Sequence, residues 1–201
     1  YMDSYCFYAL EETNIDDISK YILDKINGRD KILILCIGSD SCTGDSLGPL
    51  TGTLLKKHNC PCTIMGDLEN LVDYNNLTQK INYIKDHYKD HFIIAIDASL
   101  GDKNNIGKII IENGSISPAT ALKSGNCSVG DISIKAVVNR YSSIKYANEY
   151  ILQQTRLYYV YSMAEILSKA ILKAINDNLN SHENVYLKDT RDIFSNSVPS
   201  R

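Results

Sequence analysis

Two aspartates, Asp45 and Asp97, occupy the positions in this chain where carboxylates are best placed to do chemistry. Asp45 lies in a polar loop between Gly38 and Gly48 that follows an apolar run, and Asp97 directly follows a second apolar run. When two carboxylates lie close together, the pKa of one is raised, so that one acts as an acid and the other as a base. Such a pair can hydrolyse bonds without a serine or cysteine nucleophile.

Taken singly, each aspartate also has a simple structural explanation. Asp45 or Ser46 would cap a helix that begins near Pro49, because their side-chain oxygens accept hydrogen bonds from the first N–H groups of a helix. Asp97 would cap a short helix or turn in the same way. Asp40 is typical of a turn in the polar loop. The sequence leaves both the capping and the acid–base interpretation open.

The polar loop does not fit phosphate-binding motifs. Five residues separate Gly38 from Gly44, one more than the Walker motif has, and Asp45 stands where that motif needs a lysine. A carboxylate at that position repels phosphate. The glycine-rich dinucleotide fingerprint is also absent. We therefore expect no nucleotide and no other cofactor.

The positions of the histidines argue against nucleophilic catalysis. None of the four falls at the carboxyl end of a predicted strand: His58, His87, His91 and His182. A Ser–His–Asp or Cys–His arrangement is therefore poorly supported. Cys42 is the thiol of the polar loop, and it stays open as an alternative nucleophile although the sequence shows no base to partner it.

Strands that alternate with helices must position these residues. Continuous apolar runs at residues 31–37 and 91–96 predict strands buried on both faces, which is typical of parallel sheets. Further strands are predicted at residues 63–65, 107–112 and 131–138. Apolar residues at helical spacing predict helices over residues 16–26, 49–58, 77–88 and 155–179. This alternation predicts a three-layer α/β/α sandwich around a mostly parallel or mixed central sheet.

The predicted sheet indicates where the aspartates lie. In open α/β sheets, ligands bind in the crevice beyond the carboxyl ends of the strands. The two buried strands are expected to end at Gly38 and Asp97, so the polar loop and the segment Asp97–Gly101 should face that crevice. Asp131 opens a later strand, and either the same crevice or turn chemistry explains it.

Composition is that of an ordinary globular protein, with one domain expected over residues 1–180 and a polar tail over residues 181–201. The net charge of -3, without a long run of Lys or Arg, argues against direct binding of nucleic acid. No apolar stretch approaches the roughly 20 residues of a membrane span, and the first residues do not resemble a signal peptide. The six cysteines contain no C-x-x-C pair, so we expect reduced thiols and a cytoplasmic location.

Two motifs resemble a known family. The segment Thr43–Pro49, TGDSLGP, and the segment Ile94–Ala98, IAIDA, resemble the YyaC-type sporulation proteins, which are relatives of the germination protease of spore-forming bacteria. More distantly, the chain is similar to the hydrogenase maturation endopeptidases. Further matching segments bring the resemblance to about residues 31–173: Val129–Ile134, Val138–Asn139 and Gln154–Leu157.

The resemblance implies an α/β/α fold and endopeptidase activity. Asp45 and Asp97 match the two aspartates to which acid-type catalysis is assigned in the germination protease. The implied substrate is a protein or peptide in the cytoplasm of the sporulating cell or forespore, and small acid-soluble spore proteins are the candidates. Homo-oligomerisation is left open. We expect the residues that bind the substrate to be Asp40, Thr43, Ser46, Ser99 and Asp131.

Departures from these relatives keep two other functions open. The chain is shorter than the germination protease, and a glycine expected after the proline of Ser117–Thr120 is absent, which favours a non-catalytic sporulation factor that uses the cleft to bind protein. The hydrogenase maturation endopeptidases bind nickel with a set that includes a later histidine, whereas only His182 follows Asp97 here. We therefore expect no metal, and a metal-binding module using Asp45, Asp97 and Asp131 is a third alternative.

Overall fold

A computed structural model describes residues 4–8, 14–117 and 128–195, with the side chains of Lys145 and of residues 182–195 excepted. The strands are β1 (Ser4–Tyr8), β2 (Ile32–Cys36), β3 (Thr63–Met65), β4 (Phe92–Gly101), β5 (Lys108–Asn113) and β6 (Ile132–Arg140). The helices are α1 (Asn14–Ile26), α2 (Leu47–Lys57), α3 (Leu77–His87), α4 (Lys145–Gln153) and α5 (Leu157–Ser195), with short 3₁₀ turns η1 (Thr43–Ser46) and η2 (Lys103–Asn105).

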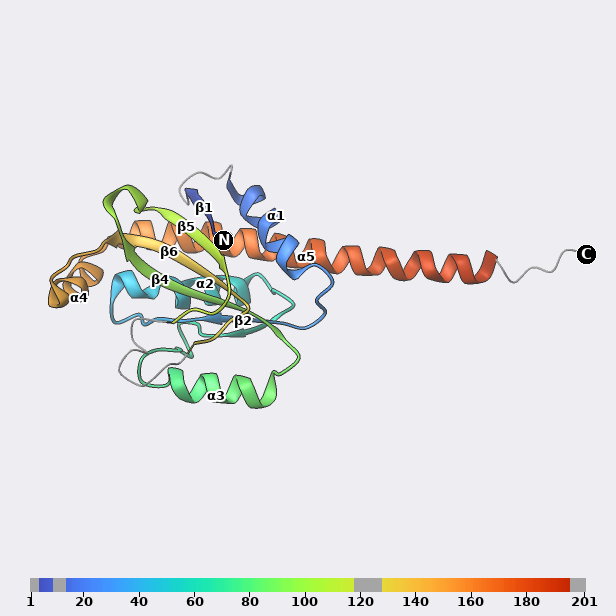
Figure 1. Cartoon of the computed structure of the whole chain (residues 1–201), viewed down its shortest axis with the longest axis horizontal. Helices are drawn as coiled ribbons and strands as arrows, with labels where there is room; N and C mark the ends of the chain where they lie inside the picture. The colour runs from blue at the N-terminus through green and yellow to red at the C-terminus, as the bar shows by residue number, and fades with distance from the viewer. Residues whose placement is uncertain (1–3, 9–13, 118–127, 196–201) are drawn as a thin grey trace, which may run out of the picture.

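Within the described residues, six strands form one mixed sheet in the order β1–β5–β6–β4–β2–β3 (Figure 1). β3, β2, β4 and β6 run parallel to one another, whereas β5 is antiparallel to both β6 and β1. The last pair between β2 and β4 is Cys36 with Ile96, and β4 then continues beside β6 as far as Gly101. The predicted mixed, mostly parallel sheet is confirmed.

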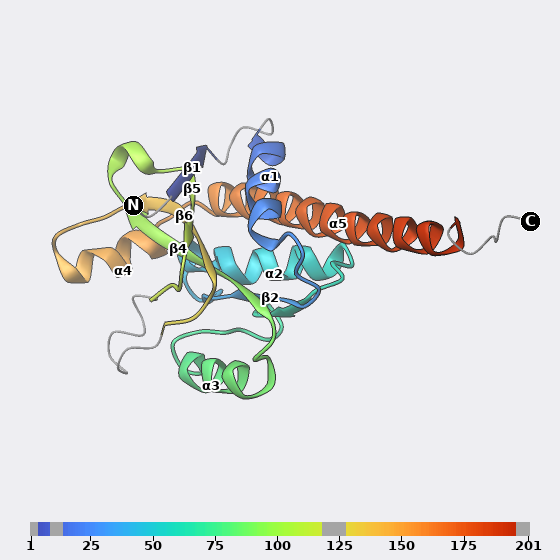
Figure 2. The ribbon, with the colours of Figure 1, turned by 45° about the vertical axis from the view of Figure 1, so that its right-hand side comes forward.

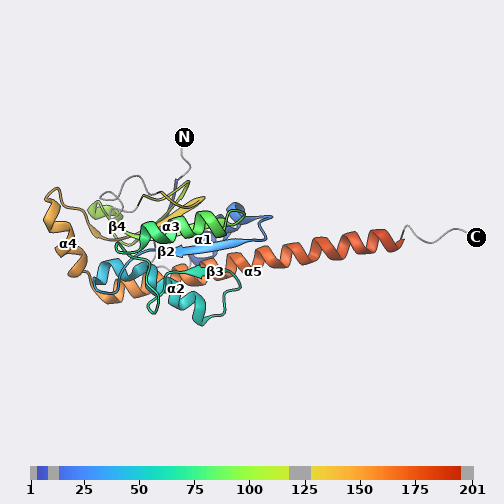
Figure 3. The same ribbon diagram turned by 90° about the horizontal axis from the view of Figure 1, so that it is seen from below.

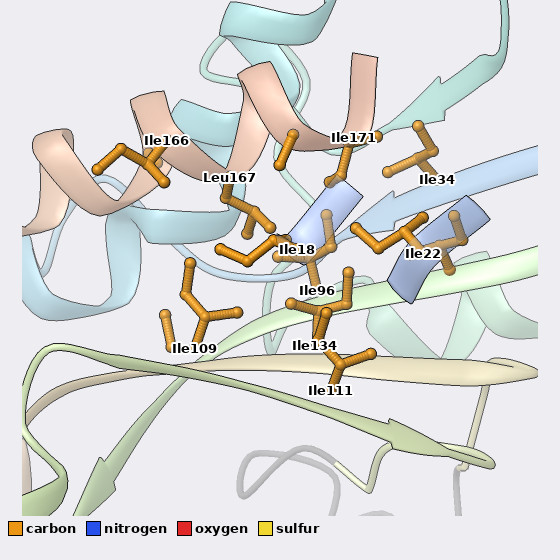
Figure 4. Packing of buried hydrophobic residues seen from close by; sticks show 14 of the residues in the cluster. Ile18, Ile22, Ile34, Ile96, Ile109, Ile111, Ile134, Ile166, Leu167 and Ile171 are labelled. Atoms are coloured by element: carbon orange, nitrogen blue, oxygen red, sulfur yellow. The ribbon is translucent and has the colours of Figure 1, made fainter. Parts of the chain in front are cut away.

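Helices cover both faces of the sheet, which completes the predicted three layers. Successive residues of a strand point to opposite faces, so the apolar run of β2 supplies both cores. Ile34, Ile96 and Ile134, from three adjacent strands, face α1 and α5, where Ile18 and Ile171 meet them (Figure 4). Leu33, Leu35 and Ala95 face the other way and pack with the apolar residues of α3, which are Leu77, Ile81 and Ile84.

The last helix is longer than the sequence analysis predicted. α5 begins at Leu157 and continues to Ser195, past the predicted end at residue 179, because no glycine or proline interrupts that stretch. Its first half packs on the sheet, and the ribbon then extends beyond the body of the protein (Figures 1 and 3). Among the described residues, no helix is both long and apolar enough to cross a membrane.

Candidate functional site

A cleft of about 570 Å³ opens at the carboxyl ends of β2, β4 and β6, where the sequence analysis placed the binding crevice. α4 forms one wall and lies at the end of the molecule opposite the far end of α5 (Figure 2). The polar residues lining the cleft are Asp45, Asp73, Asp97, Ser99, Ser117, Lys135, Asn148 and Glu149. The larger apolar and aromatic lining residues are Ile37, Tyr74, Leu100, Ile116, Tyr141 and Leu152.

Sheet register fixes the position of Asp97. It is the first residue of β4 beyond the last pair with β2, and it pairs with Lys135 of β6. The backbone N–H of Ala98 donates to its carboxylate. The prediction that this strand ends at Asp97 is wrong, because pairing with β6 carries β4 on to Gly101. Asp97 therefore lies inside a strand, and the helix-capping interpretation does not apply to it.

A tight loop holds Asp45 next to the end of β2. Gly38 has a φ of 142°, and a Cβ there would lie 2.0 Å from the carbonyl oxygen of Asp45, so only glycine fits. The backbone N–H of Ser39 donates to the carboxylate of Asp45. Ser46, the residue before α2, makes no side-chain capping bond within the described chain, and its Oγ donates to the carbonyl oxygen of Thr43 at 2.7 Å. The loop thus presents Asp45 to the cleft.

The carboxyl groups of Asp45 and Asp97 lie close enough together for the charge of Asp45 to affect the pKa of Asp97. Burial and then the nearby Asp45 carboxylate raise the pKa of Asp97 well above its usual value, against the opposing effects of the Ala98 N–H and the Lys135 charge. Burial also raises the pKa of Asp45, with a smaller contribution from Asp73. Asp97 is therefore the member of the pair that keeps its proton to higher pH.

Lys135 supplies the positive charge among the residues that line the cleft. Its Nζ donates to the Oε2 of Glu112 at 2.7 Å, an ion pair that joins β6 to β5 beside Asp97. This ion pair holds the Lys135 ammonium beside Glu112, and the Glu112 charge weakens the effect of the ammonium on the aspartates. As a result, the cation moderates the raised pKa of Asp97 without forming the direct ion pair that would ionise it.

Cys42 lines the cleft, but its surroundings do not favour a nucleophile. Burial raises the pKa of this thiol, although the backbone N–H groups of Asp45 and Gly44 act in the opposite direction. A thiol in its protonated form is a poor nucleophile. Among the residues described as lining the cleft there is no histidine to act as its base. The thiol alternative is thus weaker than the pair of aspartates.

The residues predicted to bind substrate divide into two groups. Ser99 lines the cleft two residues beyond Asp97. Asp40 is exposed in a turn. Thr43 and Ser46 are hydrogen-bonded to each other within η1. These three belong to the loop that carries Asp45 and are not among the described residues that line the cleft.

The structure corrects the prediction for Asp131, because this residue lies at the opposite edge of the sheet from the cleft. It precedes β6 at the amino ends of the parallel strands, where its Oδ2 accepts from the N–H of Ile93 at 2.7 Å. Its own N–H donates to the carbonyl of Ile93 at 2.8 Å. The expectation that Asp131 approaches the same crevice is wrong, since β6 has to cross the sheet before its carboxyl end meets the cleft.

Replacement of Asp131 by alanine should therefore act on stability alone. The loss of one hydrogen bond to a backbone N–H is expected to lower the free energy of unfolding by about 1 kcal/mol, as measured by urea denaturation. Asp40→Ala, at an exposed turn of the polar loop, is the matched control and should leave the unfolding midpoint unchanged. A change in any cleavage activity of Asp131→Ala, at equal folded fraction, would contradict this placement.

Several cleft residues were missed from the sequence. Lys135 had a usable signal, because the alternation of Ile132, Ile134 and Ala136 places it on the other face of its strand. Asn148 and the residues around it lie on α4, a helix that the sequence analysis did not predict.

The aspartates do not form the three-carboxylate metal site that the sequence analysis kept as a third alternative. Asp45 and Asp97 lie at one edge of the sheet and Asp131 at the other. Among the described residues there is no group of three or more His, Cys, Asp or Glu side chains arranged to hold a metal ion. The described side chains that line the cleft do not fit a nickel site of the hydrogenase maturation type, since that site includes a histidine and none is among them.

The fold is that of a hydrogenase maturation protease. The chain resembles the structure of the [NiFe] hydrogenase maturation protease HycI from Thermococcus kodakarensis KOD1, with a TM-score of 0.53 and 17% identity over 78% of this chain and 99% of that one. At this identity the likeness defines the fold alone.

The chain belongs to the family described as "Protein of unknown function (DUF1256)", which it matches over residues 6–170. It is 37% identical to the uncharacterized protein YyaC of Bacillus subtilis (strain 168) over 164 residues, which are 81% of this chain and 78% of that protein. The resemblance to YyaC-type proteins is confirmed.

Proposed function

We propose that this protein is a sporulation-associated endopeptidase, related to the germination protease, that hydrolyses a peptide bond of a spore protein with Asp45 and Asp97. The observation that carries the proposal is the presence of both carboxyl groups in one cleft, with burial and the Asp45 charge raising the pKa of Asp97. The fold of a maturation protease supports the same class of reaction.

In the proposed mechanism, the ionised carboxylate of Asp45 is the general base and protonated Asp97 is the general acid. Asp45 takes a proton from a water molecule whose oxygen attacks the peptide carbonyl carbon, while Asp97 donates its proton to the carbonyl oxygen. The tetrahedral intermediate then collapses, Asp45 returns its proton to the leaving amine, and Asp97 recovers its proton from the former carbonyl oxygen. One water is consumed for each bond broken.

The lining of the cleft suggests which peptides it accepts. Its walls are apolar and aromatic, whereas its ionisable groups are four carboxyl groups and one ammonium: Asp45, Asp73, Asp97, Glu149 and Lys135. Lys135 is already paired with Glu112, so the remaining charge of the cleft is negative. A segment with an apolar residue beside a lysine or arginine would complement it.

The test is a cleavage assay on spore proteins. Purified wild type, Asp45→Asn and Asp97→Asn are incubated with a small acid-soluble spore protein fraction, and the products are followed by mass spectrometry. We expect a defined cleavage product with the wild type and none above background with either variant. The same product pattern from all three proteins would exclude aspartate-based hydrolysis.

A second function, a non-catalytic sporulation factor that binds protein in the same cleft, is favoured by one feature. Apolar and aromatic side chains are exposed on α4, which forms one wall of the cleft, and on the loop before it, with Tyr146 86% and Ile144 66% exposed, and Tyr141 and Tyr150 also exposed. Exposed groups of this kind mark protein-binding surfaces. Absence of cleavage by the wild type, together with loss of sporulation in both aspartate variants, would favour this function over the peptidase.

A further inference from the structure

A pair of cysteines lies at the edge of the sheet away from the cleft. Cys60 and Cys62 flank Pro61 in the turn between α2 and β3. Because β3 is parallel to β2, this turn lies at the amino ends of the strands. The spacing is too short for a usual zinc-binding pair, and the proposed peptidase chemistry makes no use of either thiol.

The end of α2 fixes the geometry of this turn. Asn59 adopts a left-handed conformation with a φ of 54° and donates its N–H to the carbonyl of Lys56 at 3.0 Å. Cys60 donates its N–H to the carbonyl of Leu55, also at 3.0 Å, which closes the end of the helix. Thr63 then pairs with Leu33 in the sheet. Both ends of the three-residue turn are therefore held by backbone hydrogen bonds.

The two sulfur atoms are hydrogen-bonded to each other across Pro61, with the Cys62 thiol donating to the Cys60 sulfur. This bond lowers the pKa of Cys60 to about 7, against the opposing effect of burial. The pKa of Cys62 is raised by the same bond and by burial. Near neutral pH the pair therefore consists of a thiolate and an adjacent thiol, which is the arrangement of an attacking and a resolving cysteine.

Cys60 and Cys62 are more accessible to solvent than Cys36, the third cysteine nearby. Cys36 is completely buried in β2, and burial raises its pKa, so it stays a core thiol. Cys60 and Cys62 are only half-buried, and Cys62 lines a cavity of about 160 Å³ at the amino edge of the sheet. A small disulfide therefore has a route to this pair that it lacks to Cys36.

We propose that Cys60 and Cys62 form a thiol–disulfide exchange site whose oxidant is a small-molecule disulfide of the glutathione class. The Cys60 thiolate attacks one sulfur of the disulfide, and the S–S bond breaks to release one small thiolate. Cys62 then loses its proton, and its sulfur attacks the Cys60 sulfur and expels the second small thiolate. Two protein thiols are oxidised to one disulfide, one small disulfide is reduced to two thiols, and the protons pass to the released thiolates.

The whole folded chain allows a direct test. Trypsin cuts after Lys57 and Lys80, and the peptide of residues 58–80 contains Cys60 and Cys62 and no other cysteine. The folded protein is equilibrated with glutathione disulfide at pH 7, quenched with acid, alkylated and digested. We expect this peptide to lose two hydrogen atoms and to take up no alkylating agent. The Cys62→Ser variant should instead carry one glutathione on Cys60.

A kinetic control separates the folded site from ordinary thiol reactivity. Alkylation of Cys60 by iodoacetamide in the folded protein should show a midpoint near pH 7, and this should be lost in urea. Exposed Cys6 is the reference thiol in the same sample. Two free thiols in the 58–80 peptide after treatment with glutathione disulfide, or stable glutathione on both cysteines, would overturn the proposal.

Discussion

The Asp97→Asn variant is expected to lose about 100-fold or more in the rate of peptide hydrolysis and to gain stability at pH 7. An amide keeps the shape of the carboxyl group but cannot donate the proton that the proposed mechanism requires. It also removes a buried acid whose ionisation is opposed by burial and by the charge of Asp45. Opposite changes in activity and stability are typical of residues held at a site for chemistry.

The gain in stability depends on pH in a defined direction. The pKa of Asp97 is raised in the folded protein, so the folded state binds its proton more tightly than the unfolded chain, in which aspartate titrates near about 3.9. Its contribution is therefore complete below that value and is lost as pH rises through the folded pKa. Asparagine does not titrate, so the stability advantage of Asp97→Asn should grow from acid to neutral pH.

Urea denaturation at a series of pH values from 4 to 8 measures this effect. Asp40→Asn is the matched control, because it removes an exposed carboxylate from the same polar loop, and its stability should follow the wild type at every pH. A variant Asp97→Asn that is less stable than the wild type at pH 7, or that keeps its full hydrolytic rate, would show that Asp97 is a structural residue.

The sequence predicted the sheet because its strongest patterns are local. The apolar runs before Gly38 and before Asp97 are long enough to require strands buried on both faces, and β2 and β4 form there. The positions of both aspartates followed from those two strands. What could not be predicted was how far β4 continues, because pairing with β6, a contact distant in sequence, determines its end.

Asp131 shows what the sequence could not predict about the site. An aspartate at the start of a strand and one at the end of a strand have similar local sequence, and only the direction of the strand in the sheet separates them. β6 runs parallel to β4, which places Asp131 beside Ile93 and places Lys135 beside Asp97. Alternation within β6 was a signal that could have identified the face of Lys135, whereas its ion pair with Glu112 depends on an antiparallel neighbour.

Gly66→Ala is expected to destabilise the protein by about 4 kcal/mol or more, which is at the upper end for single substitutions. Gly66 follows β3 with a φ of 92°, and an added Cβ would lie 1.8 Å from the carbonyl oxygen of Cys36. That atom belongs to the backbone of a central strand and cannot rotate away. From the other side, a Cβ on Gly52 of α2 would lie 1.9 Å from the carbonyl oxygen of Gly66. The strand end, the loop and the helix therefore meet through backbone atoms.

Gly107→Ala separates this steric effect from backbone preference. Gly107 has a φ of 86°, close to that of Gly66, but an added Cβ there has no described atom within 4 Å. It should cost only the conformational strain, about 1–2 kcal/mol, in the same urea denaturation experiment. Equal losses for the two variants would mean that the chain relaxes around Gly66. Such relaxation would have to move Cys36, two residues before Gly38, and the loop that holds Asp45. If Gly66→Ala loses less stability than expected, the titration of Asp45 and Asp97 should therefore change as well.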